Sequence, residues 1–351
     1  DVQISDEMRD KGIRLITSVR ASLFYMGFNM LDATVGGAGP GGVGAERARK
    51  LRQALSIAID QEEFISIFMN GRGIAAMNPV PPGIFGHGEG AAGINPVVYN
   101  WEGDAQNGQP RRKPIAVAKQ LLADAGWPNG RDARTNEPLV LYLDTPSGMG
   151  DKPTMDWLTR QFAKIDIQLV VRQTDGNRFQ EKLRKGAVQI FFFGWNADYP
   201  DPENFFFLLS GSEAKVATGG ENAANYVNSE YDRLFAEMKD MDNTPQRLQI
   251  VQRMRRILQD DAPWIFGFYP KSYTLGHNWL HNRKPNDVAN NILKYQRIDV
   301  ALRERQRAAW NAPVLWPLAL IALLIAALVV PAVAAYRRRE RGVARDRHQG
   351  S

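Results

Sequence analysis

The residues best suited to chemistry in this sequence are two aspartates and a tryptophan in one short segment. Residues 188–210 read VQIFFFGWNADYPDPENFFFLLS, so Trp195, Asp198 and Asp201 follow an apolar run of strand length that ends at Gly194. A buried strand would therefore deliver an indole and carboxylates to one edge of a sheet. This is the layout of a ligand-binding site in an open α/β sheet, where the rigid sheet sets the geometry and a loop supplies the chemistry.

Other motifs give weak support to metal, nucleotide or hydrolytic chemistry. His277 and His281 are four residues apart, as zinc ligands can be, but no glutamate accompanies them. Residues 37–42 (GAGPGG) have the spacing of a dinucleotide-binding turn, yet Asp60 falls within a helical pattern, so we expect a surface loop. The chain has no cysteine and four histidines, and thiol or triad catalysis has almost no support. We therefore expect no enzyme activity, no cofactor and no metal.

The segments before the motif alternate between strand and helix patterns. Strand-like runs cover residues 139–144 and 167–173 and a third strand ends at Trp195, while helical spacing of apolar residues covers 155–165 and 177–185. Such alternation predicts an α/β lobe with parallel strands and right-handed crossovers. Nearer the N-terminus the sequence predicts a strand at 23–30, helices at 46–59, 60–68 and 114–125, and a loop at 74–113. Asp60 is expected to cap the second of these helices, and Asn70 with Gly71 to end it.

Five segments resemble, in order, those of one protein family. Residues 194–202, Gly-Trp-x-Ala-Asp-Tyr-x-Asp-Pro, resemble the hallmark segment of the periplasmic solute-binding proteins that feed ABC importers, the oligopeptide, dipeptide and nickel class known as family 5. Residues 52–82 and 118–130 resemble helices and turns of the same family, and residues 225–232 and 261–263 also match. The similarity covers roughly residues 10–300 and identifies the chain as the C-terminal part of such a protein.

The resemblance implies a periplasmic-binding-protein-like lobe of class II and a peptide site at the motif. In relatives the aspartate of the motif pairs with the α-ammonium of a bound peptide, and the backbone just before it hydrogen-bonds the peptide as an added strand. Carried over, Asp198 is the amine anchor and residues Gly194 to Asn196 form the strand edge. Trp195 is then one wall of the side-chain pocket.

Similarity of position also implies that Tyr25, Asn29 and Tyr269 face the same cleft. The alternative is that each is a core residue whose polar group is satisfied by hinge backbone. Asp201 has a simpler interpretation, because an aspartate beside two prolines usually forms a turn and caps the following helix, here residues 203–209.

A run of 25 residues without a charge, at 312–336, predicts a transmembrane helix. At 1.5 Å per residue it reaches about 37 Å, more than the roughly 30 Å of a hydrocarbon core, and we expect a kink at Pro331. Trp316 and Tyr336 lie near its ends, as interfacial anchors do. The basic tail at 337–351 outweighs Arg303, Arg305 and Arg307 on the other flank, so the positive-inside rule places the tail in the cytoplasm and the globular part outside.

The charge of the chain does not indicate nucleic acid. The formal net charge is +6, and the tail at 337–351 carries a net +4, which leaves +2 for the rest. The globular body is therefore almost neutral, and we expect no nucleic-acid partner.

The predicted domains follow from these segments. They are residues 1–30, a returning segment of the first lobe with the hinge; 31–262, the second α/β lobe; 263–311, a return to the first lobe and a linker; 312–336, the membrane helix; and 337–351, the cytoplasmic tail. The chain enters the family pattern partway, so we expect a fragment or a partner-dependent half.

We expect a membrane-anchored component of an ABC importer on the periplasmic face of the bacterial inner membrane. It would bind peptides or peptide-like amines, close its lobes around them and be recognised by the permease. The alternatives are a sensor or scaffold that kept the fold, and a nickel or metal-chelate carrier.

Overall fold

A computed structural model describes residues 3–39, 42–104, 107–148, 150–286, 288–289 and 291–348. By its internal contacts the chain divides into two units. The first comprises Asp1–Gly276 and Arg283–Tyr295, and the second His277–Asn282 and Gln296–Ser351. The motif at 194–202 lies in the first unit, whereas the apolar run at 312–336 lies in the second. The surface loop expected at 37–42 lies partly outside the described residues.

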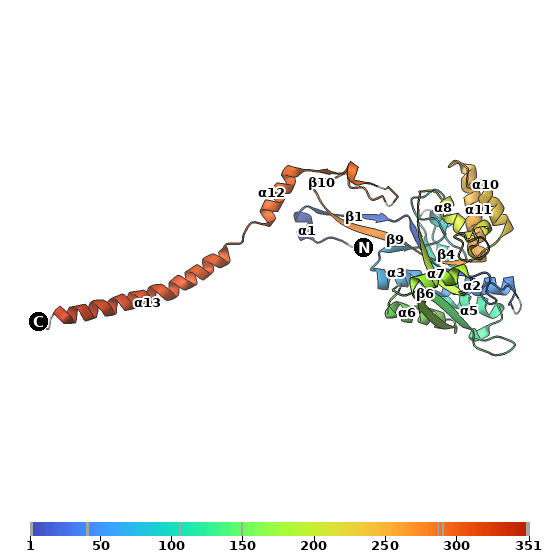
Figure 1. The fold of residues 1–351 in the computed structure, drawn as a ribbon, viewed down its shortest axis with the longest axis horizontal. Helices are drawn as coiled ribbons and strands as arrows, with labels where there is room; N and C mark the ends of the chain where they lie inside the picture. The colour runs from blue at the N-terminus through green and yellow to red at the C-terminus, as the bar shows by residue number, and fades with distance from the viewer. Residues whose placement is uncertain are drawn as a thin grey trace. The chain divides into compact units, whose positions relative to one another are not determined.

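The first unit is built on a seven-stranded mixed sheet with the order β1-β9-β2-β8-β6-β7, and β3 pairs with β9 (Figure 1). Strand β6 is parallel to both β7 and β8, which confirms the parallel pairing predicted from the alternating pattern. Strand β2 is antiparallel to β8 and β9. The bounds are β1 Ile13–Val19, β2 Ser22–Phe28, β3 Gly73–Ala75, β6 Val140–Pro146, β7 Gln168–Thr174, β8 Ile190–Asn196 and β9 Trp264–His277.

Helices cover both faces of this sheet because successive strand residues point to opposite sides and both sides are apolar. On the face that carries Tyr25 and Phe191, the core includes side chains of α7, α8, α10 and α11. On the face that carries Met26 and Phe192, it includes side chains of α2, α3, α5 and α6. We call these the Tyr25 face and the Met26 face. The bounds are α2 Ala45–Ala58, α3 Gln61–Met69, α5 Ile115–Asp124, α6 Lys152–Ala163, α7 Gly176–Arg184, α8 Glu203–Phe206, α10 Ser229–Met238 and α11 Pro245–Asp261.

The capping residues explain where these helices begin and end. The Asp60 carboxylate accepts a hydrogen bond from the backbone N of Glu63 at 2.9 Å, so Asp60 caps α3 as predicted. Helix α3 ends at Asn70, which is left-handed with φ 52°, a conformation that asparagine tolerates. Pro114 is the N-cap of α5, so that helix begins one residue later than predicted.

The predicted loop at 74–113 is wrong in part. It contains a β-hairpin, β4 Tyr99–Glu102 with β5 Gln109–Arg112, and a short helix, α4 Gly90–Gly93. Tyr99 and Trp101 alternate with polar residues, as in a half-buried strand, but the many glycines and prolines around them favoured a loop. The remaining helices of this unit are α1 Asp6–Asp10 and α9 Lys215–Thr218.

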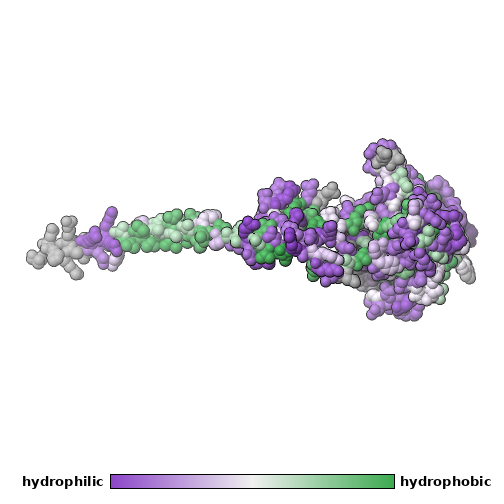
Figure 2. All heavy atoms as spheres, turned by 90° about the horizontal axis from the view of Figure 1, so that it is seen from above, coloured by the Kyte–Doolittle hydropathy of each residue, from purple (hydrophilic) through white to green (hydrophobic). Residues whose placement is uncertain are grey.

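The second unit holds a short antiparallel pair, β10 Leu280–His281 with β11 Arg297–Ile298, followed by α12 Val300–Trp310 and α13 Trp316–His348. Within α13 the stretch Trp316–Arg341 has 26 residues; an 18-residue window of it has a mean hydropathy of 2.9, and none of that window is buried. It is long and apolar enough to cross a membrane. Figure 2 shows this hydrophobic stretch ending in hydrophilic residues. The helix continues through Pro331.

Candidate ligand-binding site

Strand β8 extends beyond one of its neighbours at its carboxyl end. It pairs with β2 at seven positions but with β6 only at Ile190 and Phe191. Strand β6 ends at Pro146, which by this register lies opposite Phe193, so residues 194–196 run past β6. Among the described residues no strand pairs with this edge, so the segment predicted as the strand edge is free on the side away from β2.

The direction of the backbone groups follows from the pairing with β2. Ala197 N donates to Ala21 O at 2.8 Å, and Asn29 N donates to Gln189 O at 2.9 Å. In an antiparallel ladder alternate residues bond to the same neighbour, so the odd-numbered residues of β8 bond to β2. The even-numbered residues direct their backbone N–H and C=O groups to the free edge.

The turn after β8 is held by Asn204, a residue of α8 that is only 2% exposed. Its Oδ1 accepts hydrogen bonds from the indole Nε1 of Trp195 at 3.1 Å and from the backbone N of Asp198 at 2.9 Å. Its Nδ2 donates to an Asp198 carboxylate oxygen at 3.4 Å. One buried amide therefore positions both the indole and the carboxylate that the sequence singled out.

The predicted site residues on β8 and its turn lie together at the surface. The Asp198 side chain is exposed, and Trp195 is half-buried, with its indole edge-on to the ring of Phe207 at 5.4 Å. Asn196 accepts a hydrogen bond from the Ser22 hydroxyl at 2.7 Å, which ties the end of β8 to β2. An exposed carboxylate beside a partly exposed indole and a free strand edge can bind an ammonium group and an extended backbone.

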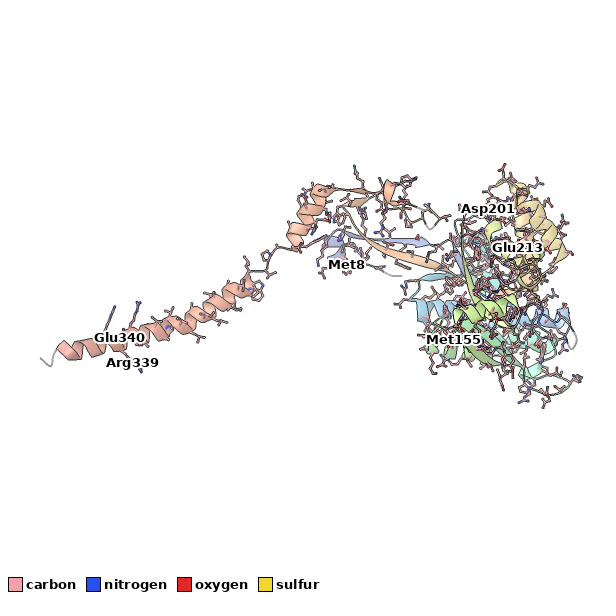
Figure 3. The ribbon with its side chains drawn as sticks, viewed as in Figure 1. Met8, Met155, Asp201, Glu213, Arg339 and Glu340 are labelled. Atoms are coloured by element: carbon pink, nitrogen blue, oxygen red, sulfur yellow. The ribbon has the colours of Figure 1, made fainter. Side chains whose placement is uncertain are left out.

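Asp201, which is labelled in Figure 3, lies three residues beyond Asp198 and has different hydrogen-bond partners. The guanidinium of Arg247, a residue only 2% exposed, donates two hydrogen bonds to the Asp201 carboxylate, at 2.7 and 2.8 Å. Asp201 also accepts a hydrogen bond from the backbone N of Glu203 at 2.8 Å, which confirms its predicted role at the start of the following helix. Arg247 further donates to Met238 O and Asn243 Oδ1.

The structure does not bring Tyr25 and Tyr269 to the surface beside Asp198. Tyr25 is 1% exposed, and its ring stacks on that of Trp264 with centroids 3.7 Å apart. Tyr269 is fully buried and donates a hydrogen bond to Asn78 O. Burial raises the pKa of both phenols far above the ordinary value, so both stay neutral. Both tyrosines match the alternative in which they are core residues.

Asn29 comes directly after β2, at the end of that strand away from Trp195. At 3.3 Å per residue, it lies about 20 Å from Trp195 along the strand. Its Nδ2 donates to Gly186 O at 3.0 Å and Val188 O at 2.9 Å. Its Oδ1 accepts from Leu31 N and Asn225 Nδ2, both at 3.2 Å. All donors and acceptors of the amide are therefore used inside the fold, which also matches the core alternative.

A pocket of about 380 Å³ opens on the Met26 face, at the same end of β8. We call it the Phe24 pocket. Its walls come from β2, β8 and β9 and from helices α3 and α6, and they include Phe24, Phe64, Phe68, Met155, Phe192 and Phe268.

Aromatic rings line the Phe24 pocket continuously. Phe24 stacks on Phe268 with centroids 5.1 Å apart, and Phe64 lies 5.6 Å from Phe268. Phe64 in turn contacts Phe68 at 5.3 Å and Trp157 at 5.4 Å. Among the described residues that line the pocket, the only ionisable one is Asp151, at the start of α6.

The sequence reasoning missed Asn204, Arg247 and the Phe24 pocket. The sequence gives an indication of Asn204, since an asparagine inside an apolar helical run is poorly placed unless its amide has buried partners. It also gives an indication of Phe64 and Phe68, because they are four residues apart on α3 and share a face. Nothing in the sequence indicates the pairing of Arg247 with Asp201, because the two are 46 residues apart.

Comparisons with known proteins agree with the family resemblance seen in the sequence. Residues 2–216 match the family model described as "Bacterial extracellular solute-binding proteins, family 5 Middle". Heme-binding protein A of Haemophilus influenzae is 31% identical over 230 residues, which are 64% of this chain and 38% of that protein.

Solved structures of about twice this length share the fold. HbpA2 from Haemophilus parasuis has a TM-score of 0.66 at 20% identity, over 83% of this chain and 51% of that one. DppA from Helicobacter pylori in complex with the peptide STSA has a TM-score of 0.62 at 21% identity, over 82% of this chain and 49% of that one. The chain thus spans about half or less of the length of these relatives. Because the family model covers more than half of its residues, the chain belongs to the family 5 bacterial extracellular solute-binding proteins.

Proposed function

We propose that this chain is part of a substrate-binding protein that captures peptides or peptide-like amines and delivers them to an ABC permease. The observation that carries the proposal is the free edge of β8 at residues 194–196, shortly before the exposed carboxylate of Asp198. An extended peptide added to that edge would hydrogen-bond to the backbone groups of Gly194 and Asn196. Its α-ammonium would then pair with Asp198, and Trp195 would flank a side chain.

Binding of this kind requires a second wall. A ligand pocket buries most of its ligand's surface, whereas a strand edge on one lobe covers one side only. We propose that residues 31–262 form the second lobe, and that residues 1–30 and 263–311 belong to the hinge, the first lobe and a linker. Closure of the two lobes over the peptide is the signal for the permease.

The apolar stretch of α13 supports a membrane anchor. The uncharged part of α13, residues 316–336, has 21 residues and is about 31 Å long, enough to cross the roughly 30 Å hydrocarbon core. We propose that it anchors the protein in the bacterial inner membrane, with the arginines at 337–341 in the cytoplasm and the globular part on the periplasmic face. The full-length product should resist carbonate extraction, while a chain stopped at Asn311 should be soluble. Release of the intact chain by carbonate would contradict the anchor.

The same peptide in two forms, with a free and with an acetylated N-terminal amine, tests the function directly. We consider the complete protein, in which both lobes are present. There tetra-alanine should bind roughly 30-fold or more tightly than N-acetyl-tetra-alanine, because acetylation leaves the Asp198 carboxylate unpaired inside a closed cleft. Isothermal titration calorimetry measures both affinities. Equal affinities would remove Asp198 as the amine anchor and with it the main support for peptide binding.

Heme is a second candidate ligand, since the Haemophilus influenzae relative is named a heme-binding protein. The aromatic walls of the Phe24 pocket favour a flat apolar group as well. Titration with hemin, followed by its visible absorption band, separates the two. A saturable spectral shift at micromolar hemin, without binding of tetra-alanine, would support heme in place of a peptide.

A further inference from the structure

The Phe24 pocket lies where alternate side chains of an added strand would point, and this inference rests on the proposed function. We propose that the pocket receives a large uncharged side chain, aromatic or branched aliphatic, from a peptide bound along β8, and that it sets the side-chain preference of the protein. The preference applies to alternate residues of the peptide only. The pocket also disfavours side chains that carry a carboxylate.

The register of β8 supports the placement. Residues directly opposite each other in adjacent strands project to the same face of the sheet. A peptide residue opposite Gly194 or Asn196 would therefore project to the Met26 face, where Phe24 and Phe192 line the pocket. A residue opposite Trp195 would project to the Tyr25 face instead.

The loop after β6 also supports it. Strand β6 ends at Pro146, and the chain then crosses to α6, whose first residues line the pocket. Thr154 and Met155 are half-buried members of that wall. An added strand would thus run between β8 and the start of α6, and its side chains would enter the pocket directly.

The lining chemistry decides which side chain fits. A volume of about 380 Å³ is within the range of ligand pockets and exceeds what one side chain needs, so a phenyl or indole ring can enter. The described lining residues include no lysine, arginine or histidine, and Asp151, their one acid, is exposed to solvent. A carboxylate-bearing side chain would lose its hydration there without a cationic partner.

A phenylalanine scan through tetra-alanine tests the proposal on the full-length protein. Calorimetry should show an affinity gain of about tenfold or more at positions of one parity and little change at the other, because burial of a phenyl ring contributes to binding only on the pocket side. Glutamate at the favoured positions should bind more weakly than alanine. Equal gains at all four positions would overturn the proposal, because a general hydrophobic contribution to binding would not alternate from one peptide position to the next.

Two arginine variants on α6 make the test specific. Met155→Arg places a cation in the pocket, so the phenylalanine gain should fall by about tenfold or more and glutamate should become the preferred residue. Thr159→Arg adds the same charge on the exposed side of the same helix and should leave the wild-type pattern. An unchanged parity pattern in Met155→Arg would also overturn the proposal. Circular dichroism checks that both variants are folded.

The outcomes separate this proposal from the function on which it rests. If free and acetylated peptides bind equally but the parity pattern persists, the amine anchor fails and the pocket stands. If the amine is required but phenylalanine gives no gain at any position, the function stands and the pocket fails. The neutral aromatic probe N-phenyl-1-naphthylamine decides the case without peptides: its fluorescence should rise on binding to wild type and Thr159→Arg, and much less with Met155→Arg. Equal fluorescence in all three would overturn the pocket.

Discussion

Asp198 and Asp201 lie in the same turn, but their carboxylates have different partners. Asp201 accepts two hydrogen bonds from the buried guanidinium of Arg247 and one from the backbone of Glu203. Asp198 accepts one long hydrogen bond from Asn204 among the described residues, and its side chain is exposed. An ionised carboxylate has about four acceptor sites, so most of those on Asp198 are open to a ligand. The motif therefore contains one structural acid, Asp201, and one acid that is available to a ligand, Asp198.

Asp201→Asn should have the largest effect, and the effect should be on stability. The change leaves the guanidinium of Arg247 buried without a counter-charge, which typically costs about 3–5 kcal/mol. We expect a loss of about 3 kcal/mol, at the lower end of that range, because the introduced amide oxygen still accepts one hydrogen bond. Urea denaturation measures the loss, and Asp198→Asn is the matched control, with a change within about 0.5 kcal/mol. Equal losses in the two variants would contradict the comparison.

A double-mutant cycle measures how much of the stability loss comes from the pairing of Asp201 with Arg247. Arg247→Met removes the buried charge and leaves Asp201 partly hydrated, since its side chain is 30% exposed, so this variant should lose less stability than Asp201→Asn. In the Arg247→Met background, Asp201→Asn should then cost less than about 1 kcal/mol. The free energies of unfolding of the four proteins give the coupling. Additive losses would show that Asp201 acts only through the helix start.

Asp198→Asn should change affinity and leave stability unaltered. Removing one partner of a buried charge pair typically costs about 2–5 kcal/mol in a closed complex, so tetra-alanine should bind about 30-fold more weakly or worse. N-acetyl-tetra-alanine should lose little more in the variant, because its ammonium is already gone. Calorimetry on the full-length protein measures both. A variant that binds both peptides as wild type does would make Asp198 a turn residue like Asp201.

Asn204→Ala should affect both properties, each to a smaller degree. The amide of Asn204 holds Trp195 Nε1 and the backbone of Asp198, so its loss frees the turn and leaves two donors to find water. We expect about 1–2 kcal/mol lower stability and a several-fold weaker affinity for tetra-alanine. A loss of stability without any loss of affinity would mean that the turn does not position the ligand site.

The sequence predicted the local parts of this arrangement well. Asp60, Asn70 and Pro114 mark helix ends through contacts within a few residues, and the order of strands and helices predicts the parallel pairing of β6 with β7 and β8. The turn role of Asp201 was also predictable, because its partner Glu203 is two residues away.

The remaining features depend on partners far away in the chain. The same alternating apolar pattern gives a closed core on the Tyr25 face and the Phe24 pocket on the Met26 face. Whether a half-buried ring meets another ring or a cavity is decided by the helices that cover it. Position in a family pattern likewise could not show that the amide of Asn29 is fully used inside the fold.

The order of strands in the sheet has a consequence for how the protein is made. Strand β2 begins at Ser22, yet its two neighbours are β8, which begins at Ile190, and β9, which begins at Trp264. Strand pairings of such high contact order form slowly, because the entropy cost of closing a long loop comes before the stabilising contacts are made. The central strand therefore waits for the last quarter of the chain. The sheet is completed only after residues beyond 264 are available, which suits the proposed topology, in which the globular part crosses a membrane before it folds.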